Sequence, residues 1–228
     1  LGGAAYASCK KYCTADVDCG HGREAEAAAV VAEGMNHLGL GKREQRARIA
    51  ELLRGANSYY SNRIEGQHTH PQDIERALRK DFDKAPDKAR LQRLAIAHID
   101  TQKEMESWLA ADSSPSVYAP AFIARLHESF YGKLPARERV TEQGDAILPG
   151  EWRKKDVRVG DHIAPDWRTV PQFLERVEQV YSVQKGTGRQ LIALACAHHR
   201  LAWVHPFRDG NGRVLRLQSQ AALIKQGS

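Results

Sequence analysis

Twelve residues near the end of the chain combine the types and spacing that phosphate chemistry requires. A glycine-flanked turn that opens a helix directs bare backbone N–H groups at an anion. A carboxylate just before the turn can hold a divalent cation, and two arginines three positions apart share a helix face and can grip one phosphate chain. A histidine outside the turn can take a proton from an incoming hydroxyl. The segment is His205-Pro206-Phe207-Arg208-Asp209-Gly210-Asn211-Gly212-Arg213-Val214-Leu215-Arg216.

Each of these residues also has an ordinary structural interpretation when it is taken alone. A Gly-x-Gly turn is mostly only a turn, and two arginines at this spacing are more often part of a solvated helix face. Phe207 is expected to be a core residue under either interpretation. The joint pattern, rather than any single residue, favours phosphate chemistry.

The segment from His205 to Arg216 resembles the full Fic motif, His-x-Phe-x-Asp/Glu-Gly-Asn-Gly-Arg-x-x-Arg, with no departure at any defined position. Fic proteins mostly transfer AMP from ATP to a hydroxyl side chain of a target protein. The resemblance implies that His205 is the general base and that Asp209 holds Mg²⁺. The centre of the motif is altered in relatives that move phosphocholine or phosphate, and its unaltered form here favours AMP transfer.

The resemblance also assigns the ATP-binding residues. It implies that Asn211 and the backbone of Gly210 and Gly212 line the phosphate pocket, while Phe207 packs inward to fix the loop. The β- and γ-phosphates are then expected on Arg213 and Arg216.

A second segment, Ser61-Asn62-Arg63-Ile64-Glu65-Gly66, resembles the inhibitory motif of the same family, Ser/Thr-x-x-x-Glu-Gly/Asn. Gly66 suits a helix end. A glutamate near that end is disfavoured by the helix dipole, so it needs a cationic partner or is simply exposed to solvent. The resemblance implies that Glu65 pairs with Arg216, which then cannot hold the γ-phosphate. A solvated glutamate is the alternative for this short motif.

The helix that carries the inhibitory motif is predicted over residues 42–60. Its apolar residues recur at three- and four-residue steps, which is typical of an amphipathic helix. These residues are Ile49, Leu52, Leu53, Ala56 and Tyr60.

A short alternation around Val157 and Val159, bounded by Pro149-Gly150 and Gly160, predicts a small β-hairpin. Fic proteins carry such a flap over the active site, where its edge pairs with the backbone of the target, a general way to hold an extended segment. The flap residues that match the family pattern and are expected to contact the target are Arg153, Val157, Val159, Gly160 and His162. Trp152 is a further candidate contact, and ordinary loop positions are the alternative for Trp152 and His162.

Composition excludes several classes of protein. The 228 residues, with 42% hydrophobic and 27% charged, are typical of a globular chain with a real core. The sequence contains no apolar run of ~18 residues, so no membrane span is predicted, and no secretory signal is visible. The net charge of +6 suits an anionic partner such as ATP. Because the basic residues are spread along the chain, we expect no nucleic-acid partner. We also expect a cytoplasmic, bacterial protein.

The four cysteines are too few to form a disulfide framework for this length. Cys196 lies in an apolar helical run and is expected in the core. Cys9, Cys13 and Cys19, followed by His21, could bind a metal, but their spacing matches no zinc module. A small-residue tail is the preferred interpretation of this segment.

The chain is predicted to be all-α, a Fic-type bundle of seven or eight helices with a small β-hairpin flap. Three regions are expected: a tail at 1–23, a helical region at 24–115 with the inhibitory helix, and the Fic core at 116–228. Thr69 is the expected cap of a helix ending near residue 80. The other expected helices are 24–38, 42–60, 86–110, 118–131, 170–181, 189–203 and 213–225.

The resulting hypothesis is an ATP- and Mg²⁺-dependent protein adenylyltransferase held inactive by Glu65. Its target would offer a Tyr, Thr or Ser hydroxyl, and self-modification and homo-oligomer formation are consistent with it. One alternative is an enzyme that removes AMP, or works in both directions, by using Glu65. The other is a DNA-binding regulator, for which we expect a C-terminal domain beyond Ser228.

Overall fold

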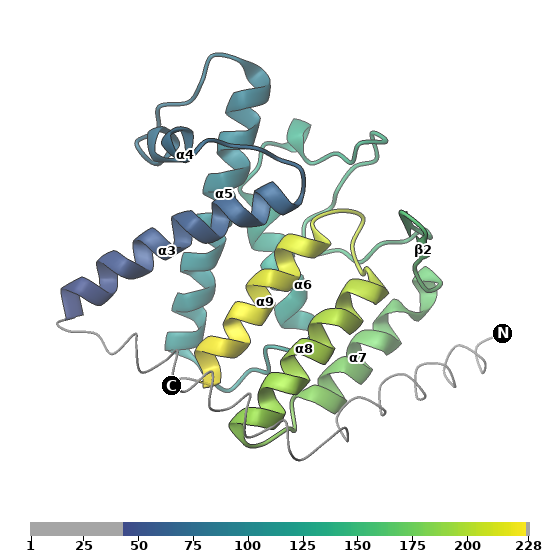
Figure 1. Ribbon diagram of the computed structural model, residues 1–228. Helices are drawn as coiled ribbons and strands as arrows, with labels where there is room; N and C mark the ends of the chain where they lie inside the picture. The colour runs from purple at the N-terminus through teal and green to yellow at the C-terminus, as the bar shows by residue number, and fades with distance from the viewer. Residues whose placement is uncertain (1–42, 227–228) are drawn as a thin grey trace.

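The computed structural model describes residues 43–226, and within them the chain folds into seven α-helices and one small sheet (Figure 1). The sheet pairs β1 (Arg158–Val159) with β2 (His162–Ile163) in antiparallel fashion, and two 3₁₀ turns lie at Ala136–Glu138 and Trp167–Thr169. The prediction of a helical protein with one small hairpin is confirmed. The helices are α3 (Arg43–Ile64), α4 (Pro71–Leu78), α5 (Pro86–Ala111), α6 (Pro120–Gly132), α7 (Val170–Tyr181), α8 (Thr187–Val204) and α9 (Asn211–Gln226).

The helix expected at 24–38 and the Cys9, Cys13, Cys19 and His21 cluster lie outside the described residues. No helix within 43–226 is long and apolar enough to cross a membrane. The expected division near residue 115, between the helical region and the Fic core, stays a prediction. Helix α5 precedes it and contributes Met105 and Leu109 to the same apolar cluster as α6 to α9.

Prolines determine where several helices begin, because a proline fits the first turn, where its missing N–H costs nothing. Pro71, Pro86 and Pro120 each start a helix. The prediction that Thr69 caps α4 is wrong for this reason. The cap position falls on the residue before Pro71, and His70 occupies it, with Nδ1 accepting a hydrogen bond from the Gln72 amide at 3.4 Å. Thr69 is buried instead.

Helix α9 lies at the centre of the fold, with α8 and then α7 beside it on one side and α5 and α6 against its other faces (Figure 1). The largest apolar cluster joins buried residues of all five helices and includes Leu126, Leu174, Leu201 and Val214. This packing fixes α8 and α9 relative to each other. It therefore also fixes the loop between them, which holds the twelve-residue motif.

Helix α3 lies across α5 and meets the start of α9 (Figure 1), but with the opposite face from the one that its sequence predicts. The expected apolar stripe faces solvent, with Leu52 74% and Tyr60 61% exposed. The buried face is polar and contains Ser58, Ser61 and Asn62.

The reason for this reversal lies on α5, which presents polar groups to α3. Ser58 Oγ donates to the Ala95 carbonyl at 2.8 Å, and Arg54 forms an ion pair with Glu106 at 2.6 Å. A buried polar group needs such partners, so complementary hydrogen bonding rather than the apolar period sets the orientation of α3.

Candidate functional site

The motif begins at the C-terminal end of α8, where His205 is the cap residue with φ 50° and ψ 63°. This left-handed conformation is uncommon for a residue other than glycine, so the surrounding structure must hold it. Arg153 does so from both its side chain and its backbone. Its Nε donates to the His205 carbonyl at 2.9 Å, and its amide donates to the Pro206 carbonyl at 2.9 Å.

Arg153 does not fit the expected role of a target contact. Its side chain is buried, and the guanidinium also donates to the carbonyls of Lys155, Pro165 and Val204. A side chain enclosed in this way cannot reach a bound protein. Arg153 instead ties the segment before the flap to residues 205–210 between α8 and α9, the candidate catalytic loop.

Phe207 and Asn211 close the loop from the inside. Phe207 is completely buried, as predicted. The Asn211 side chain, however, does not line the phosphate pocket as expected. Its Oδ1 accepts from the Phe207 amide at 2.8 Å and its Nδ2 donates to the Phe207 carbonyl at 2.9 Å. Both ends of the Asn211 amide are therefore used to fold the loop.

Gly210 occupies a position that only glycine can take. Its φ is 77°, and a Cβ there would lie 2.6 Å from Cε2 of Tyr131. Helix α9 starts directly after it, and the Val214 amide donates to the Gly210 carbonyl at 3.0 Å. The first backbone N–H groups of a helix have no partner inside the helix, so this turn is suited to an anion.

Asp209 stands at the edge of the turn, with its side chain 43% exposed. Its Oδ1 accepts from the Gly210 amide at 2.6 Å and lies 3.6 Å from Arg213 Nη2. Within residues 43–226 no group of three His, Cys, Asp or Glu side chains could enclose a metal. A single exposed carboxylate fits Mg²⁺, because this ion keeps several waters and is commonly bound through one carboxylate and substrate phosphates.

The two motif arginines are both held by the segment at the end of α3. Arg216 donates to Ser61 Oγ at 2.9 Å and to the Ser61 carbonyl at 3.0 Å, and forms an ion pair with Glu65 at 2.5 Å. Arg213 is buried and donates to Gln67 Oε1 at 2.8 Å. The expected pairing of Glu65 with Arg216 is present.

Glu65 also covers the glycine turn. A Cβ added at Gly212 would overlap Oε1 of Glu65 and would lie 3.0 Å from Nη1 of Arg216. The carboxylate of Glu65 is therefore placed directly over the first turn of α9. A carboxylate in that position is itself an anion at a helix N-terminus, where the dipole favours negative charge.

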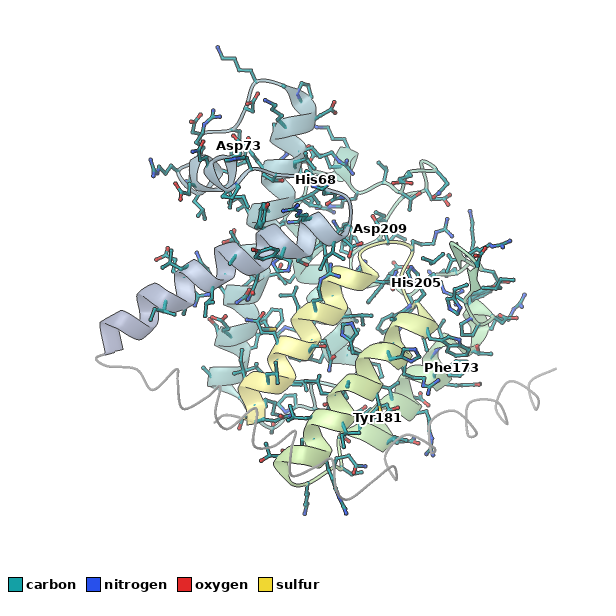
Figure 2. The ribbon with its side chains drawn as sticks, viewed as in Figure 1. His68, Asp73, Phe173, Tyr181, His205 and Asp209 are labelled. Atoms are coloured by element: carbon teal, nitrogen blue, oxygen red, sulfur yellow. The ribbon has the colours of Figure 1, made fainter. Side chains whose placement is uncertain are left out.

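Glu65, His205, Asp209 and Arg213 meet at a cavity of about 560 Å³. Figure 2 shows His205 and Asp209 on the loop between α8 and α9, close to the segment after α3 that carries His68. The lining residues come from this segment, the catalytic loop, the start of α5, the 140–143 loop and the flap. They include Glu65, Gln67, Arg90, Thr141, Val157, Val159, His205, Arg208, Asp209 and Arg213.

Comparison with known proteins matches residues 118–223 to the Fic/DOC family. These residues form a Fic domain. The chain is 36% identical over 130 residues to "Protein adenylyltransferase Fic" of Drosophila melanogaster, which covers 57% of this chain and 26% of that protein. The chain thus spans about a quarter of the length of the curated relatives it matches.

Solved structures share the fold at low sequence identity. A Fic domain containing signaling protein from Bacteroides thetaiotaomicron superposes with a TM-score of 0.68 at 18% identity, over 88% of this chain and 73% of the other. Residues 134–508 of Fic-1 from C. elegans give 0.67 at 18% identity, over 90% of this chain and 57% of the other. This similarity confirms the Fic-type helical bundle.

The hairpin of this Fic domain lies beside the cavity and turns at Gly160, whose φ is 58°. Val159 pairs with His162, and Arg158 with Ile163. Val157 and Val159 line the cavity, as a flap requires. His162 and Trp152 anchor the flap region: His162 Nε2 donates to the Trp203 carbonyl at 2.8 Å, and the rings of Trp152 and Phe207 lie 4.8 Å apart.

The environment of His205 suits a group that accepts a proton. Burial lowers the pKa of His205 below its ordinary value, and the positive charge of Arg153 lowers it further. A hydrogen bond to the Ala202 backbone raises the pKa in part. The imidazole is therefore neutral near pH 7, which is the form that a general base needs.

Three side chains that contact residues of the Fic motif were not predicted from the sequence. Gln67 lies just beyond the inhibitory motif, and nothing in its surroundings marks it. His127 and Tyr131 lie one turn apart on α6 and both meet the loop, His127 at Asp209 and Phe207 and Tyr131 at Arg213. Two polar rings within the apolar face of a helix are the signal that could have identified them.

Proposed function

We propose that this protein transfers AMP from ATP to a hydroxyl side chain of a protein and that its own Glu65 inhibits the reaction. The observation that carries the proposal is the convergence of His205, Asp209 and Arg213 on one cavity beside a helix N-terminus. The name of the Drosophila relative, protein adenylyltransferase, supports the same reaction. ATP is the substrate that this arrangement suits, because it presents a chain of phosphates to the turn and to the arginines.

In the proposed reaction the target hydroxyl loses its proton to His205, on the ring nitrogen that does not bond the Ala202 backbone. The hydroxyl oxygen then forms a bond to the α-phosphorus, while the bond from that phosphorus to the β-phosphate oxygen breaks. Pyrophosphate leaves with the electron pair. Arg213 and Arg216 would stabilise the growing negative charge of the leaving group, which is a large part of catalysis in phosphoryl transfer.

Asp209 would hold Mg²⁺ at the edge of the turn, together with phosphate oxygens and water. Bound there, the ion would neutralise charge on the phosphates. The chain contributes the orientation of the carboxylate, since the Gly210 amide holds Oδ1 of Asp209. In the flap, the backbone of strand β1 and of Gly160 would pair with the backbone of an extended target segment. This pairing leaves the target free to offer Tyr, Thr or Ser.

The inhibition follows from two competing contacts. Glu65 places a carboxylate over Gly212 and pairs with Arg216, where a phosphate would otherwise bind. Gln67 occupies Arg213 in the same way. Because the N–H groups of Arg216 and Arg213 that bond Glu65 and Gln67 cannot donate to a phosphate at the same time, these donors are withheld from ATP while the segment is docked.

A second function remains consistent with one observation. Glu65 lines the same cavity as His205 and Asp209, so its carboxylate could orient a water that removes AMP from a modified target. In that reaction Glu65→Gly would abolish release of AMP from a labelled target, whereas a purely inhibitory Glu65 would leave any such release unchanged.

The reaction type is tested with ATP labelled at different phosphates. The Glu65→Gly variant is incubated with Mg²⁺ and ATP labelled at either the α- or the γ-phosphate, and the protein is then separated. AMP transfer predicts α-label on protein and no γ-label. Label from γ-labelled ATP would instead show phosphate transfer and would overturn the proposal. Adding His205→Ala to this variant should abolish the α-label, and His199→Ala is the matched control, because His199 is exposed on α8, the helix that ends just before His205.

A further inference from the structure

The catalytic loop rests on a buried histidine of α6 that the proposed reaction does not use. His127 is 1% exposed. Its ring stacks on Phe207 with centroids 3.8 Å apart and planes 6° from parallel. Both ring nitrogens also meet backbone groups, one from the loop that leads to the flap and one from the catalytic loop. His127 therefore contacts the loop before the flap and the loop between α8 and α9 at once.

The two hydrogen bonds determine where the proton of the imidazole lies. The Gly150 amide donates to Nδ1 of His127 at 2.9 Å, so Nδ1 carries no proton. A neutral imidazole then has its proton on Nε2. Nε2 lies 3.2 Å from the Asp209 carbonyl oxygen and donates to it. The pair of backbone groups thus selects one tautomer.

The bond to the Asp209 carbonyl controls more than that oxygen. A peptide unit is planar and rigid, so fixing the carbonyl of Asp209 also fixes the amide of Gly210 on the opposite side of the same plane. That amide donates to Oδ1 of Asp209 at 2.6 Å. The orientation of the Asp209 carboxylate therefore depends on His127 through a single peptide plane.

We propose that His127 is a positioning residue for the Asp209 carboxylate and for the start of the phosphate-binding turn. It touches neither substrate nor metal and acts through the Asp209–Gly210 peptide. Its bond to Gly150, which has φ 79°, holds the loop before the flap in register with the turn. The proposal rests on the proposed AMP transfer for its kinetic consequence, but its structural content does not.

Three variants separate the contributions of the ring, each placed in the Glu65→Gly background so that transfer is measurable. In His127→Gln the amide nitrogen can replace Nε2 and still donate to the Asp209 carbonyl. In His127→Asn the shorter amide reaches only the Nδ1 position, so its carbonyl can accept from Gly150. His127→Phe keeps the stack on Phe207 and loses both hydrogen bonds.

We expect His127→Phe and His127→Asn to lose about 10- to 100-fold in kcat, a range typical of groups that orient a metal ligand. His127→Gln should retain most of the activity. The Mg²⁺ concentration for half-maximal transfer should rise in His127→Phe and His127→Asn and stay near that of the parent in His127→Gln. Thermal melting of all four proteins measures the purely structural effect.

A readout independent of activity is nuclear magnetic resonance of the ¹⁵N-labelled protein. The ring of His127 should show a neutral form with the proton on Nε2. The Gly210 amide signal should move in His127→Asn and His127→Phe and remain near its position in His127→Gln.

Three results would overturn the proposal: equal kcat for the Gln and Asn variants, activity that simply follows the melting temperature, or a ring proton on Nδ1. If Glu65→Gly itself transfers no AMP, the proposed function fails, while the ring and Gly210 signals still decide the role of His127.

Discussion

Gln67 offers a test of the inhibition that is separate from Glu65. It lies two residues after Glu65, and its Oε1 accepts from Arg213 Nη1 at 2.8 Å. Replacing Gln67 with Ala removes this acceptor and leaves Arg213 with Tyr131 at 3.3 Å and Asp209 at 3.6 Å. Neither of these two groups lies where the replaced amide was, so the freed donor becomes available to a phosphate.

The size of the effect can be worked out from that contact. A hydrogen bond to a charged group contributes about 1.5–3 kcal/mol, and the lower end applies because this contact borders an open cavity. About 1.5 kcal/mol corresponds to roughly a tenfold change in an equilibrium constant. Gln67→Ala should therefore bind ATP with Mg²⁺ about tenfold more tightly than the parent.

Isothermal titration calorimetry with ATP and Mg²⁺ measures this affinity directly. His68→Ala is the matched control, because His68 is exposed on the same segment. In a Glu65→Gly background the effect of Gln67→Ala should be smaller, since both residues hold one docked segment and their contributions are coupled. Affinity equal to or weaker than that of the parent would refute the idea that Gln67 competes with a phosphate.

Three further predictions concern the stability of the loop and the core. Arg153→Met should lower the free energy of unfolding by about 3 kcal/mol, because several buried carbonyls lose their donor, and chemical denaturation checks this; an unchanged value would contradict the role of Arg153. Gly210→Ala should lower the melting temperature by roughly 5–15 °C, because it adds left-handed strain and a clash with Tyr131, whereas Gly132→Ala, which has open space, should change it little. Burial lowers the pKa of His98 from 6.5 to about 3, with a further contribution from the charges of Arg216 and Arg213. Below pH 6.5 the unfolded chain therefore binds a proton that the folded chain does not, so the free energy of unfolding should fall by about 1.4 kcal/mol per pH unit as the pH decreases from 6.5. His98→Gln should flatten this slope in pH-dependent melting.

The sequence was sufficient where local chemistry decides the structure. Helices α7 and α9 lie within two residues of their expected bounds. Helix α5 starts at Pro86 as expected, for a reason that the residue itself supplies. The motif was also sufficient to place His205 beside Asp209, because their spacing around a glycine turn leaves little conformational choice.

The sequence was insufficient where tertiary partners override a local pattern. The apolar stripe of α3 predicts that Leu52 and Tyr60 face the core, yet hydrogen bonds from Ser58 and Arg54 to α5 turn that stripe to solvent. Periodicity records only the preference of one helix and carries no information on the polarity of the surface it meets.

The roles of loop residues were harder still to predict, since they depend on what a side chain meets after folding. Asn211 was expected to face phosphate and instead binds the Phe207 backbone on both sides. Arg153 was expected to reach a target and instead holds the His205 carbonyl. In each case the polar atoms satisfy nearby backbone groups, and that demand is invisible until the loop is closed.

The central claim is tested most directly by the transfer of label from α-labelled ATP with Mg²⁺ to protein in three proteins. These are the parent chain, Glu65→Gly, and Glu65→Gly combined with His205→Ala. The account predicts much more label on Glu65→Gly than on the parent, and none on the double variant. Label that persists without His205, or labelling of Glu65→Gly no greater than that of the parent, would contradict it.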